Sequence, residues 1–326
     1  MRSSTPSRIA TSRHSFRGYL YIAAATLLWG IAATLGRAVF TGRWIFARSA
    51  VRPIEPLILS QGRTTLSLLV LLPILLARRG TGRLKLPARD MSQCFLLGVL
   101  GVAASNYFYY LAIQKTSVAT AIILQYTAPV WVLLYTALRL RHWPGERRLI
   151  AVALAVAGSA LAIGVVGSAG IRLDSVGVTA ALLAAFSFAF YNIGGHQILS
   201  RYDRWLVLLY TLLGASLFWL VVNPPWRIAA AHYSSGQWVF LLAFSLISVL
   251  GPFSCYFAGL QYLEPTRAIV ASCLEPVFSI VIAALALGES IRAIQTLGIL
   301  IVLAAIVLVQ MPERGGDEAT LLEPIE

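Results

Sequence analysis

The chain has 326 residues, of which 58% are hydrophobic and only 12% are charged, and its formal net charge is +13. Soluble domains carry about 25% charged residues, so this composition excludes an ordinary soluble domain, including the nucleic-acid-binding class that the positive charge would otherwise suggest. Apolar runs of roughly 20 residues recur from end to end, which is the pattern of transmembrane helices.

These runs predict an all-α integral membrane protein with ten transmembrane helices. In chain order the expected spans are 18–40, 56–78, 93–113, 117–138, 148–167, 176–198, 204–224, 237–261, 266–287 and 293–311. The loops between them are short. A basic tail (1–17) and an acidic tail (312–326) complete the chain. Little sequence is left for a soluble domain.

The basic residues are concentrated in alternate loops. If the N-terminus is inside, the cytoplasmic segments carry 17 of the 26 lysines and arginines, and the outer segments carry seven. Cytoplasmic loops of membrane proteins are enriched in Lys and Arg. The distribution therefore predicts a multi-pass protein of the cytoplasmic (inner) membrane with both termini in the cytoplasm. Its basic face suits the anionic headgroups of the lipid bilayer.

The chain aligns with itself at a shift of 147 residues, without a gap from the second expected span to the fifth. The segment YYLAIQKTSVATAI (109–122) falls on YFAGLQYLEPTRAI (256–269), and Pro129 falls on Pro276. The first and sixth spans align at a shift near 159, because TGRWIFARSAVR (41–52) is inserted as a loop extension. Five helices in each repeat make the two repeats, 18–167 and 176–311, inverted relative to each other, as in many secondary transporters.

Several short motifs occur in a characteristic order along these repeats. They are Trp29-Gly30, the stretch from Tyr109 to Ala112, the prolines Pro129 and Pro276, and Leu287-Gly288-Glu289. Together with the ten spans and the repeat, they resemble the EamA-type transporters of the drug/metabolite transporter superfamily over about residues 18–311. One departure is that the first repeat has Arg141-His142 where the second has Gly288-Glu289.

The fourth and ninth spans each contain a proline near their middle. Pro129 and Pro276 lack an N–H, so the carbonyls of Gln125 and Ser272 lose their helical partners. Freed carbonyls within a membrane must be buried in protein or line a wet cavity, and two interrupted helices at matching positions point to a transporter's binding site. The prolines therefore indicate cavity lining, with a simple packing kink as the alternative.

Glu275 precedes Pro276 and lies near the centre of its span. A charged side chain at this depth costs about 2.5–3.5 kcal/mol on insertion scales, so Glu275 should face the bundle interior. Arg63, inside the second span, is its expected partner. Three roles stay open: a structural group beside the proline, an ion pair with Arg63 or with a cationic substrate group, and a proton-coupling carboxylate.

Polar and aromatic side chains occur at a similar depth in several spans. The expected substrate-cavity residues are Trp29, Tyr110, Gln125, Asn192 and Ser272. A few polar groups among aromatic walls suit a small amphipathic metabolite, such as an amino acid. The fifth span is rich in small residues, which permits close packing either within the chain or in a homodimer.

The sequence predicts a secondary transporter that moves a small, amino acid-like metabolite by alternating access, and the family resemblance implies export. Protons or a counter-substrate are the candidate coupling partners, because the sequence contains no nucleotide-binding loop. The alternatives are a membrane scaffold or receptor without transport and, less favoured, a membrane enzyme. The four histidines are dispersed and show no metal-ligand spacing, so we expect no metal site and no catalytic residues. We also expect no cofactor and no nucleic-acid partner.

Overall fold

The computed structural model describes residues 8–40, 54–116, 118–141, 143–163, 174–287 and 291–311. The described chain consists of helices and short connections, which confirms the all-α class. Several features singled out in the sequence lie outside the described residues: the insertion at 41–52, His142, Gly288-Glu289 and the acidic tail.

The helices of the first half follow the expected spans closely. They are α1 (Arg8–Phe40), α2 (Pro56–Arg79), the 3-10 turn η1 (Thr81–Leu84), α3 (Ala88–Leu96), the π-helical η2 (Leu97–Ala103), α4 (Ala104–Lys115), α5 (Val118–Gln125), α6 (Ala128–Leu140) and α7 (Glu146–Ala162). The first helix begins well before its expected start at residue 18, because neither proline nor glycine interrupts residues 8–17.

The second half repeats this pattern with one addition. Its helices are α8 (Ser175–Leu199), α9 (Arg204–Val222), α10 (Pro225–Ala230), α11 (Ser235–Ser245), the π-helical η3 (Leu246–Leu250), α12 (Gly251–Leu260), α13 (Pro265–Ser272), α14 (Leu274–Leu287) and α15 (Ala293–Gln310). The short α10 begins at a Pro-Pro pair and lies in the loop between two spans. No separate helix was expected there.

Within the described residues, nine helices or continuous helix groups are long and apolar enough to cross a membrane. The span expected at 148–167 corresponds to α7, of which 17 residues are described. Residues 164–173, which include the end of the expected span, lie outside the described part of the chain. An integral membrane architecture is therefore established, while the count of described spans is nine rather than the ten expected.

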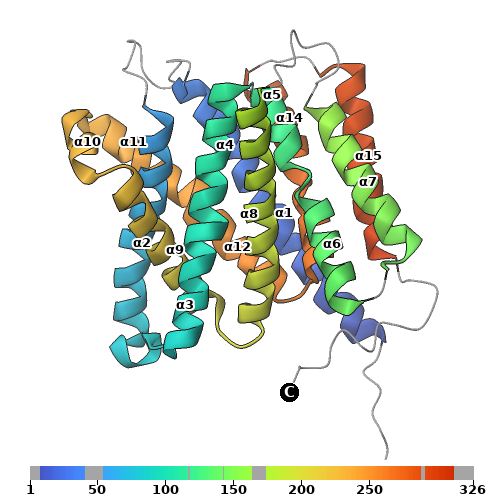
Figure 1. The fold of residues 1–326 in the computed structure, drawn as a ribbon, viewed down its shortest axis with the longest axis horizontal. Helices are drawn as coiled ribbons and strands as arrows, with labels where there is room; N and C mark the ends of the chain where they lie inside the picture. Colours follow the sequence, from blue (N-terminus) through green and yellow to red (C-terminus); the bar gives the residue numbers. More distant parts are fainter. Residues whose placement is uncertain are drawn as a thin grey trace, which may run out of the picture.

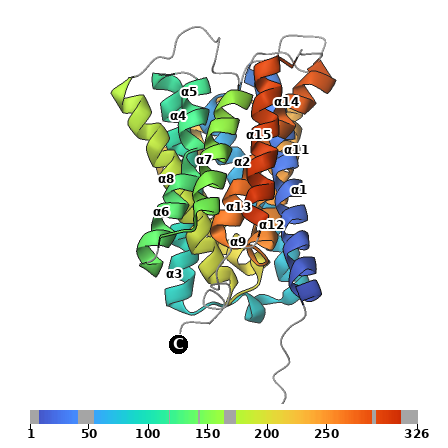
Figure 2. The same cartoon turned by 90° about the vertical axis from the view of Figure 1, so that its right-hand side faces the viewer.

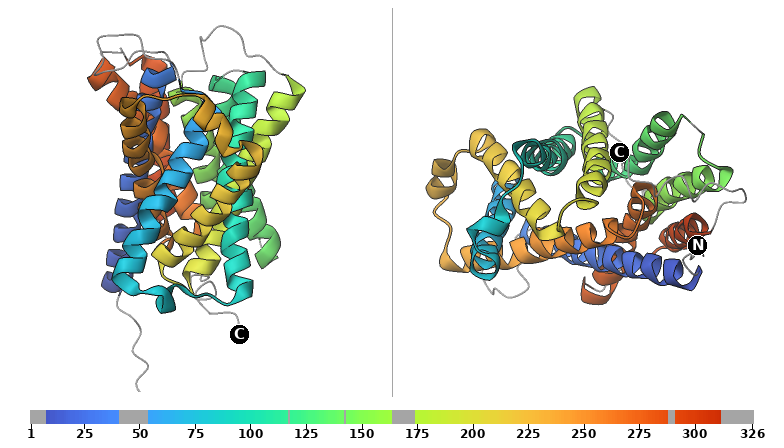
Figure 3. Two further views of the ribbon diagram at one scale, coloured as in Figure 1. Left: turned by 90° about the vertical axis from the view of Figure 1, so that its left-hand side faces the viewer. Right: turned by 90° about the horizontal axis from the view of Figure 1, so that it is seen from below.

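The helices run up and down through one bundle (Figure 1). The first residues of α1 and the last residues of α15 lie at the same end of the bundle. Figure 2 shows α7 and α15 side by side, and they form the most extensive helix pair of the described chain. Seen from below, α1 runs along the α12 and α14 segments of the second half (Figure 3). Segments from both halves thus interleave.

Small residues allow the closest helix contacts. A Cβ atom added to Gly98 in η2 would lie 2.0 Å from the carbonyl oxygen of Thr211 in α9, and one added to Gly214 would lie 2.4 Å from that of Phe95. Without a hydrophobic driving force between helices in lipid, such backbone approaches supply the packing energy.

The contact between α7 and α15 has the same basis. A Cβ atom on Gly298 would lie 2.3 Å from the backbone nitrogen of Ala162, and one on Gly158 would lie 3.0 Å from the carbonyl oxygen of Gly298. The buried face of α7, which includes Ala151 and Ala155, consists of small side chains apart from Val152. The small residues of this helix are therefore used for packing within the chain.

Candidate functional site

Two membrane helices are divided near their middle, at positions 147 residues apart. The chain leaves helical geometry after Gln125 and resumes it at Ala128, and it breaks again at Cys273 between α13 and α14. Pro129 and Pro276, both buried, lie in the first turn of the second segment in each case. A proline is compatible with a first helical turn, where its missing N–H would have no helical partner anyway.

Two further irregular segments lie in the helices that precede these breaks. The π-helical segment η2 covers Leu97–Ala103, and η3 covers Leu246–Leu250, which overlaps η2 when the chain is shifted by 147 residues. Single π-helical turns are rare in proteins, and those that occur are often found at functional sites. Four irregular segments, two in each half, therefore interrupt the spans at middle depth.

Arg63 of α2 points its guanidinium group towards α4. Its Nη2 donates a hydrogen bond to Oδ1 of Asn106. The Asn106 amide donates in turn to the carbonyl oxygen of Val102, at 2.7 Å, which fixes the orientation of the amide. The Arg63 Nε is buried and has no hydrogen-bond partner among the described residues. Arg63 is thus held by a neutral amide rather than by a carboxylate.

Glu275 lies in the first turn of α14, directly after the helix break. Its carboxylate accepts a hydrogen bond from the hydroxyl of Tyr126, which occupies the break between α5 and α6. Arg63 is close enough to interact electrostatically with Glu275. A negative charge is favoured at a helix N-terminus. A side-chain hydrogen bond therefore joins the breaks of the two divided helices, with Arg63 nearby.

Arg63 and Glu275 interact electrostatically without forming a direct ion pair. Both residues are described, and the direct ion pairs found among the described residues are formed by other side chains. Arg63, Tyr126 and Glu275 are each partly exposed, although all three lie well inside their spans. Ionisable groups at such depth are tolerated where they face protein or water.

Gln125 lies at the end of α5, and Tyr110 lies in α4. The Gln125 side chain donates a hydrogen bond of 3.5 Å to the hydroxyl of Ser105, which donates to the carbonyl oxygen of Ala184 in α8. Tyr110 is partly exposed, and its ring lies 5.6 Å from that of Tyr109. These contacts connect α4, α5 and α8.

Asn192 and Ser272 lie in a buried polar cluster around Tyr256. The Tyr256 hydroxyl donates a 2.6 Å hydrogen bond to Oδ1 of Asn192, which is 0% exposed. Ser272 is 4% exposed, and its hydroxyl donates to the carbonyl oxygen of Ile269 at 2.7 Å. The polar groups of Asn192 and Ser272 are therefore satisfied inside the protein in this conformation.

Trp29 belongs to an aromatic cluster that joins α1, α8 and α12. Its ring lies 5.4 Å from Tyr256, 5.5 Å from Phe253 and 6.3 Å from Phe188. Trp29 itself is partly exposed. Aromatic pairs at these distances add stabilisation beyond the burial of their area. The cluster forms a rigid wall that includes one partly open tryptophan.

An apolar hollow of about 310 Å³ lies between α4 and the start of α8. Its lining includes Phe108, Leu111, Val176 and Leu183. None of the residues selected from the sequence lines it. An apolar hollow between two spans fits a lipid chain better than a polar metabolite, so the hollow is not the candidate site.

Sequence reasoning selected Arg63 and Glu275 but did not choose their partners Asn106 and Tyr126 as site residues, although both lie at a similar depth in the expected spans. The sequence did contain a signal for Tyr126, because this residue directly follows the selected Gln125 and aligns with Cys273 in the second repeat. Asn106 had only its polarity in an apolar span. Which face of α4 it occupies depends on the packing of η2, and the sequence pattern does not encode that.

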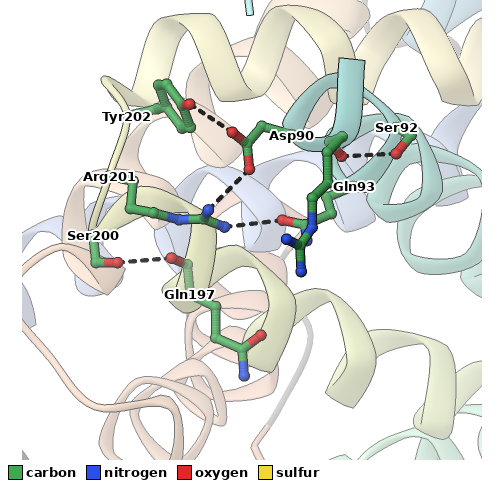
Figure 4. Close-up of polar contacts among 8 residues, drawn as sticks. Asp90, Ser92, Gln93, Gln197, Ser200, Arg201 and Tyr202 are labelled. Atoms are coloured by element: carbon green, nitrogen blue, oxygen red, sulfur yellow. Dashed lines mark hydrogen bonds and ion pairs between the residues drawn. The ribbon is translucent and has the colours of Figure 1, made fainter. Parts of the chain in front are cut away.

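A second polar cluster lies at the end of the bundle where α2 ends and α9 begins (Figure 4). Arg201 donates to the Asp90 carboxylate at 2.9 Å and to Gln93 Oε1 at 3.0 Å, and the Tyr202 hydroxyl donates to Asp90 at 2.6 Å. We call Asp90, Gln93, Arg201 and Tyr202 the α3 clasp, because they tie the start of α3 to the connection between α8 and α9.

The described chain is a helical membrane bundle in which two spans are divided at positions 147 residues apart. The EamA-like transporter family model matches residues 16–164 and 175–311. The chain therefore belongs to the EamA-like transporter family, a branch of the drug/metabolite transporter superfamily, as its sequence motifs predicted.

Individual relatives are similar over most of their length. The uncharacterized inner membrane transporter YicL of Salmonella typhimurium is 26% identical over 230 residues, which are 69% of this chain and 75% of YicL. The threonine/homoserine exporter RhtA of the same species is 28% identical over 261 residues, 79% of this chain and 84% of RhtA. A solved crystal structure with 18% identity matches with a TM-score of 0.70 over 90% of this chain and 97% of that one, so the two share a fold.

Proposed function

We propose that this protein is a secondary transporter that exports a small, amino acid-like metabolite across the inner membrane by alternating access. The observation that carries the proposal is the placement of Arg63 and Glu275, two partly exposed charges inside the spans, beside two divided helices. Charged side chains inside membrane spans mark substrate and ion pathways in membrane proteins. The functions named for the relatives, inner membrane transport and threonine/homoserine export, support the location and the direction.

The repeat supports the alternating-access part of the proposal. Irregular segments at corresponding positions of two inverted halves let one half rock against the other around a central site. Pro129 and Pro276 belong to these segments and are proposed to keep the carbonyls of Gln125 and Ser272 available to the site. Trp29, Tyr110 and Gln125 are the proposed walls. Asn192 and Ser272 are proposed to join them in a conformation that separates the cluster around Tyr256.

We infer that an ion or counter-substrate gradient drives export, with Glu275 as the first candidate for the coupling group. The test measures flux into and out of proteoliposomes loaded with amino acids and related metabolites, with and without a pH gradient. Wild type is compared with Glu275→Gln and with Glu146→Gln, a matched control on an exposed residue. Proton coupling by Glu275 predicts that Glu275→Gln still exchanges substrate but ignores the gradient.

The outcomes separate the proposal from its rivals. Saturable flux with counterflow is expected of a carrier, whereas flux that never saturates indicates a pore. If wild type moves none of the compounds under any gradient, the transport proposal is wrong and a scaffold or receptor role replaces it. If Glu275→Gln responds to the gradient as wild type does, Glu275 has a structural or ion-pairing role and coupling lies elsewhere.

A further inference from the structure

Arg63 is a cation without a directly paired anion among the described residues. One of its N–H donors is used by the neutral Asn106, and its buried Nε has no partner. An arginine offers several N–H donors in a planar fork that matches a carboxylate. A charge inside a membrane span that lacks a directly paired counter-ion is costly, so a site that keeps such a fork unpaired is suited to an anionic group that binds and leaves.

Glu275 is the complementary half of the arrangement. Its carboxylate accepts a hydrogen bond from Tyr126 and lies within electrostatic range of Arg63, and the direct ion pairs found among the described residues do not include these two side chains. Because the two charges do not meet directly, a molecule placed between them can contact both. Its positive group would approach Glu275 and its negative group would approach Arg63.

The charge pattern selects against molecules with a single charge. An anion bound at Arg63 would face the like charge of Glu275, and a cation bound at Glu275 would face Arg63. A zwitterion satisfies both ends and brings no net charge into the membrane. Repulsion of the wrong partner is a common source of specificity.

The two halves of the protein are not equivalent at this site. The positions that correspond to Arg63 and Glu275 under the 147-residue shift are Tyr210 and Ala128. Neither is an arginine or an acidic residue, and the Tyr210 hydroxyl donates a hydrogen bond to the carbonyl oxygen of Leu84 at 2.8 Å. The repeat therefore supplies one charged pair and hence one orientation of a bound molecule.

We propose that Arg63 binds the carboxylate, and Glu275 the ammonium group, of a zwitterionic α-amino acid substrate, and that Asn106 positions Arg63. This inference rests on the proposed transport function and names the head group that the same site recognises. Arg63 and Glu275 touch the substrate, whereas Asn106 acts through its hydrogen bond to the guanidinium. The side chain of the amino acid would face the aromatic wall around Trp29.

The test measures binding to the purified full-length protein by isothermal titration calorimetry. The twenty common L-amino acids are screened, and the tightest ligand is compared with its methyl ester and its N-acetyl derivative. Wild type should bind the free amino acid at least tenfold more tightly than either derivative. Arg63→Gln should weaken the free amino acid roughly 10–100-fold, as expected for lost hydrogen bonds to a charged group, and should leave the methyl ester unchanged or tighter. Glu275→Gln should show the reverse preference, sparing the N-acetyl derivative.

Arg139→Gln provides a matched control, because Arg139 is an exposed arginine near the end of α6. It should bind like wild type. Asn106→Ala should lower the ratio of amino acid affinity to methyl ester affinity, a change that a purely structural loss would not produce. If Arg63→Gln fails to fold, Arg63→Lys is used instead, because lysine keeps the charge but lacks the planar fork of donors. The ratio of amino acid affinity to methyl ester affinity is then measured for Arg63→Lys.

Three results would overturn the inference: no L-amino acid binds, wild type accepts either derivative as tightly as the free amino acid, or Arg63→Gln weakens all three ligands equally. Flux of the same ligands in proteoliposomes separates this inference from the transport proposal. Binding without flux would support the charge-pair site and contradict transport. Flux restricted to singly charged compounds would support transport and contradict the charge-pair site.

Discussion

Asp90 is the residue that holds the α3 clasp together. It is 7% exposed, and its two carboxylate oxygens accept from Arg201 and from Tyr202. The hydrogen bond to Asp90 also raises the pKa of the Tyr202 hydroxyl, so this donor stays protonated to more alkaline pH. A nearly buried carboxylate whose two oxygens both accept hydrogen bonds from the protein is expected to have a structural role rather than to bind substrate.

Replacing Asp90 with asparagine should therefore lower stability. Asp90→Asn removes the charge and one acceptor, while Arg201 is half-exposed and can be rehydrated. We expect a loss of about 1–2 kcal/mol in the free energy of unfolding, measured by thermal denaturation in detergent. Asp174→Asn is the control, because Asp174 caps α8 and asparagine caps a helix equally well. Equal stability of the two variants would mean that the clasp contributes nothing.

Residue chemistry explains why part of the candidate site was visible in the sequence. Arg63 and Glu275 stand out because charges are rare in apolar spans. Asn192 and Ser272 carry the same kind of polar signal, yet Asn192 is fully buried against Tyr256. A polar residue in a span is thus predictable as inward-facing. Whether it meets another side chain or a substrate depends on tertiary contacts.

At the scale of elements, proline position alone does not predict a break. Pro73 lies inside α2, which continues past it to Arg79. Pro129 and Pro276 instead lie just after interruptions of the spans. The difference was readable only from the repeat, because Pro129 and Pro276 correspond to each other. The π-helical segments η2 and η3 were not predictable, since a π turn depends on small shifts in helix packing.

The contact between η2 and α9 supplies a prediction for helix packing. Gly98→Ala places a methyl group against the Thr211 carbonyl, so one helix must move. Overpacking of this kind costs roughly 1–3 kcal/mol, and the melting temperature in detergent should fall accordingly. Gly82→Ala is the control, because a Cβ atom there meets nothing within 4 Å. Unchanged melting of Gly98→Ala would contradict the close approach of α9 to η2.

At the scale of the whole molecule, charge is distributed unevenly between the two ends of the bundle. The end where α2 finishes and α9 begins carries many basic side chains, including Arg78, Arg79, Arg83, Lys85, Arg201 and Arg204. The positive-inside rule assigns this end to the cytoplasm. The start of α1 and the end of α15 lie at the same end, so the proposed orientation places both termini inside.

Thiol labelling in intact cells tests this orientation. Cys94, Cys255 and Cys273 all lie within spans and are first replaced by alanine. A cysteine is then introduced at Gly82, in the connection after α2, or at Gly236, near the start of α11 at the opposite end.

An impermeant maleimide should label Gly236→Cys in intact cells. It should reach Gly82→Cys only after the membrane is permeabilised, because the proposed orientation places the basic end in the cytoplasm. The cysteine-free parent should remain unlabelled in both conditions. Labelling of Gly82→Cys in intact cells, with protection of Gly236→Cys, would invert the topology. Export would then require release at the end that carries the α3 clasp, so the proposed direction of transport depends on this result.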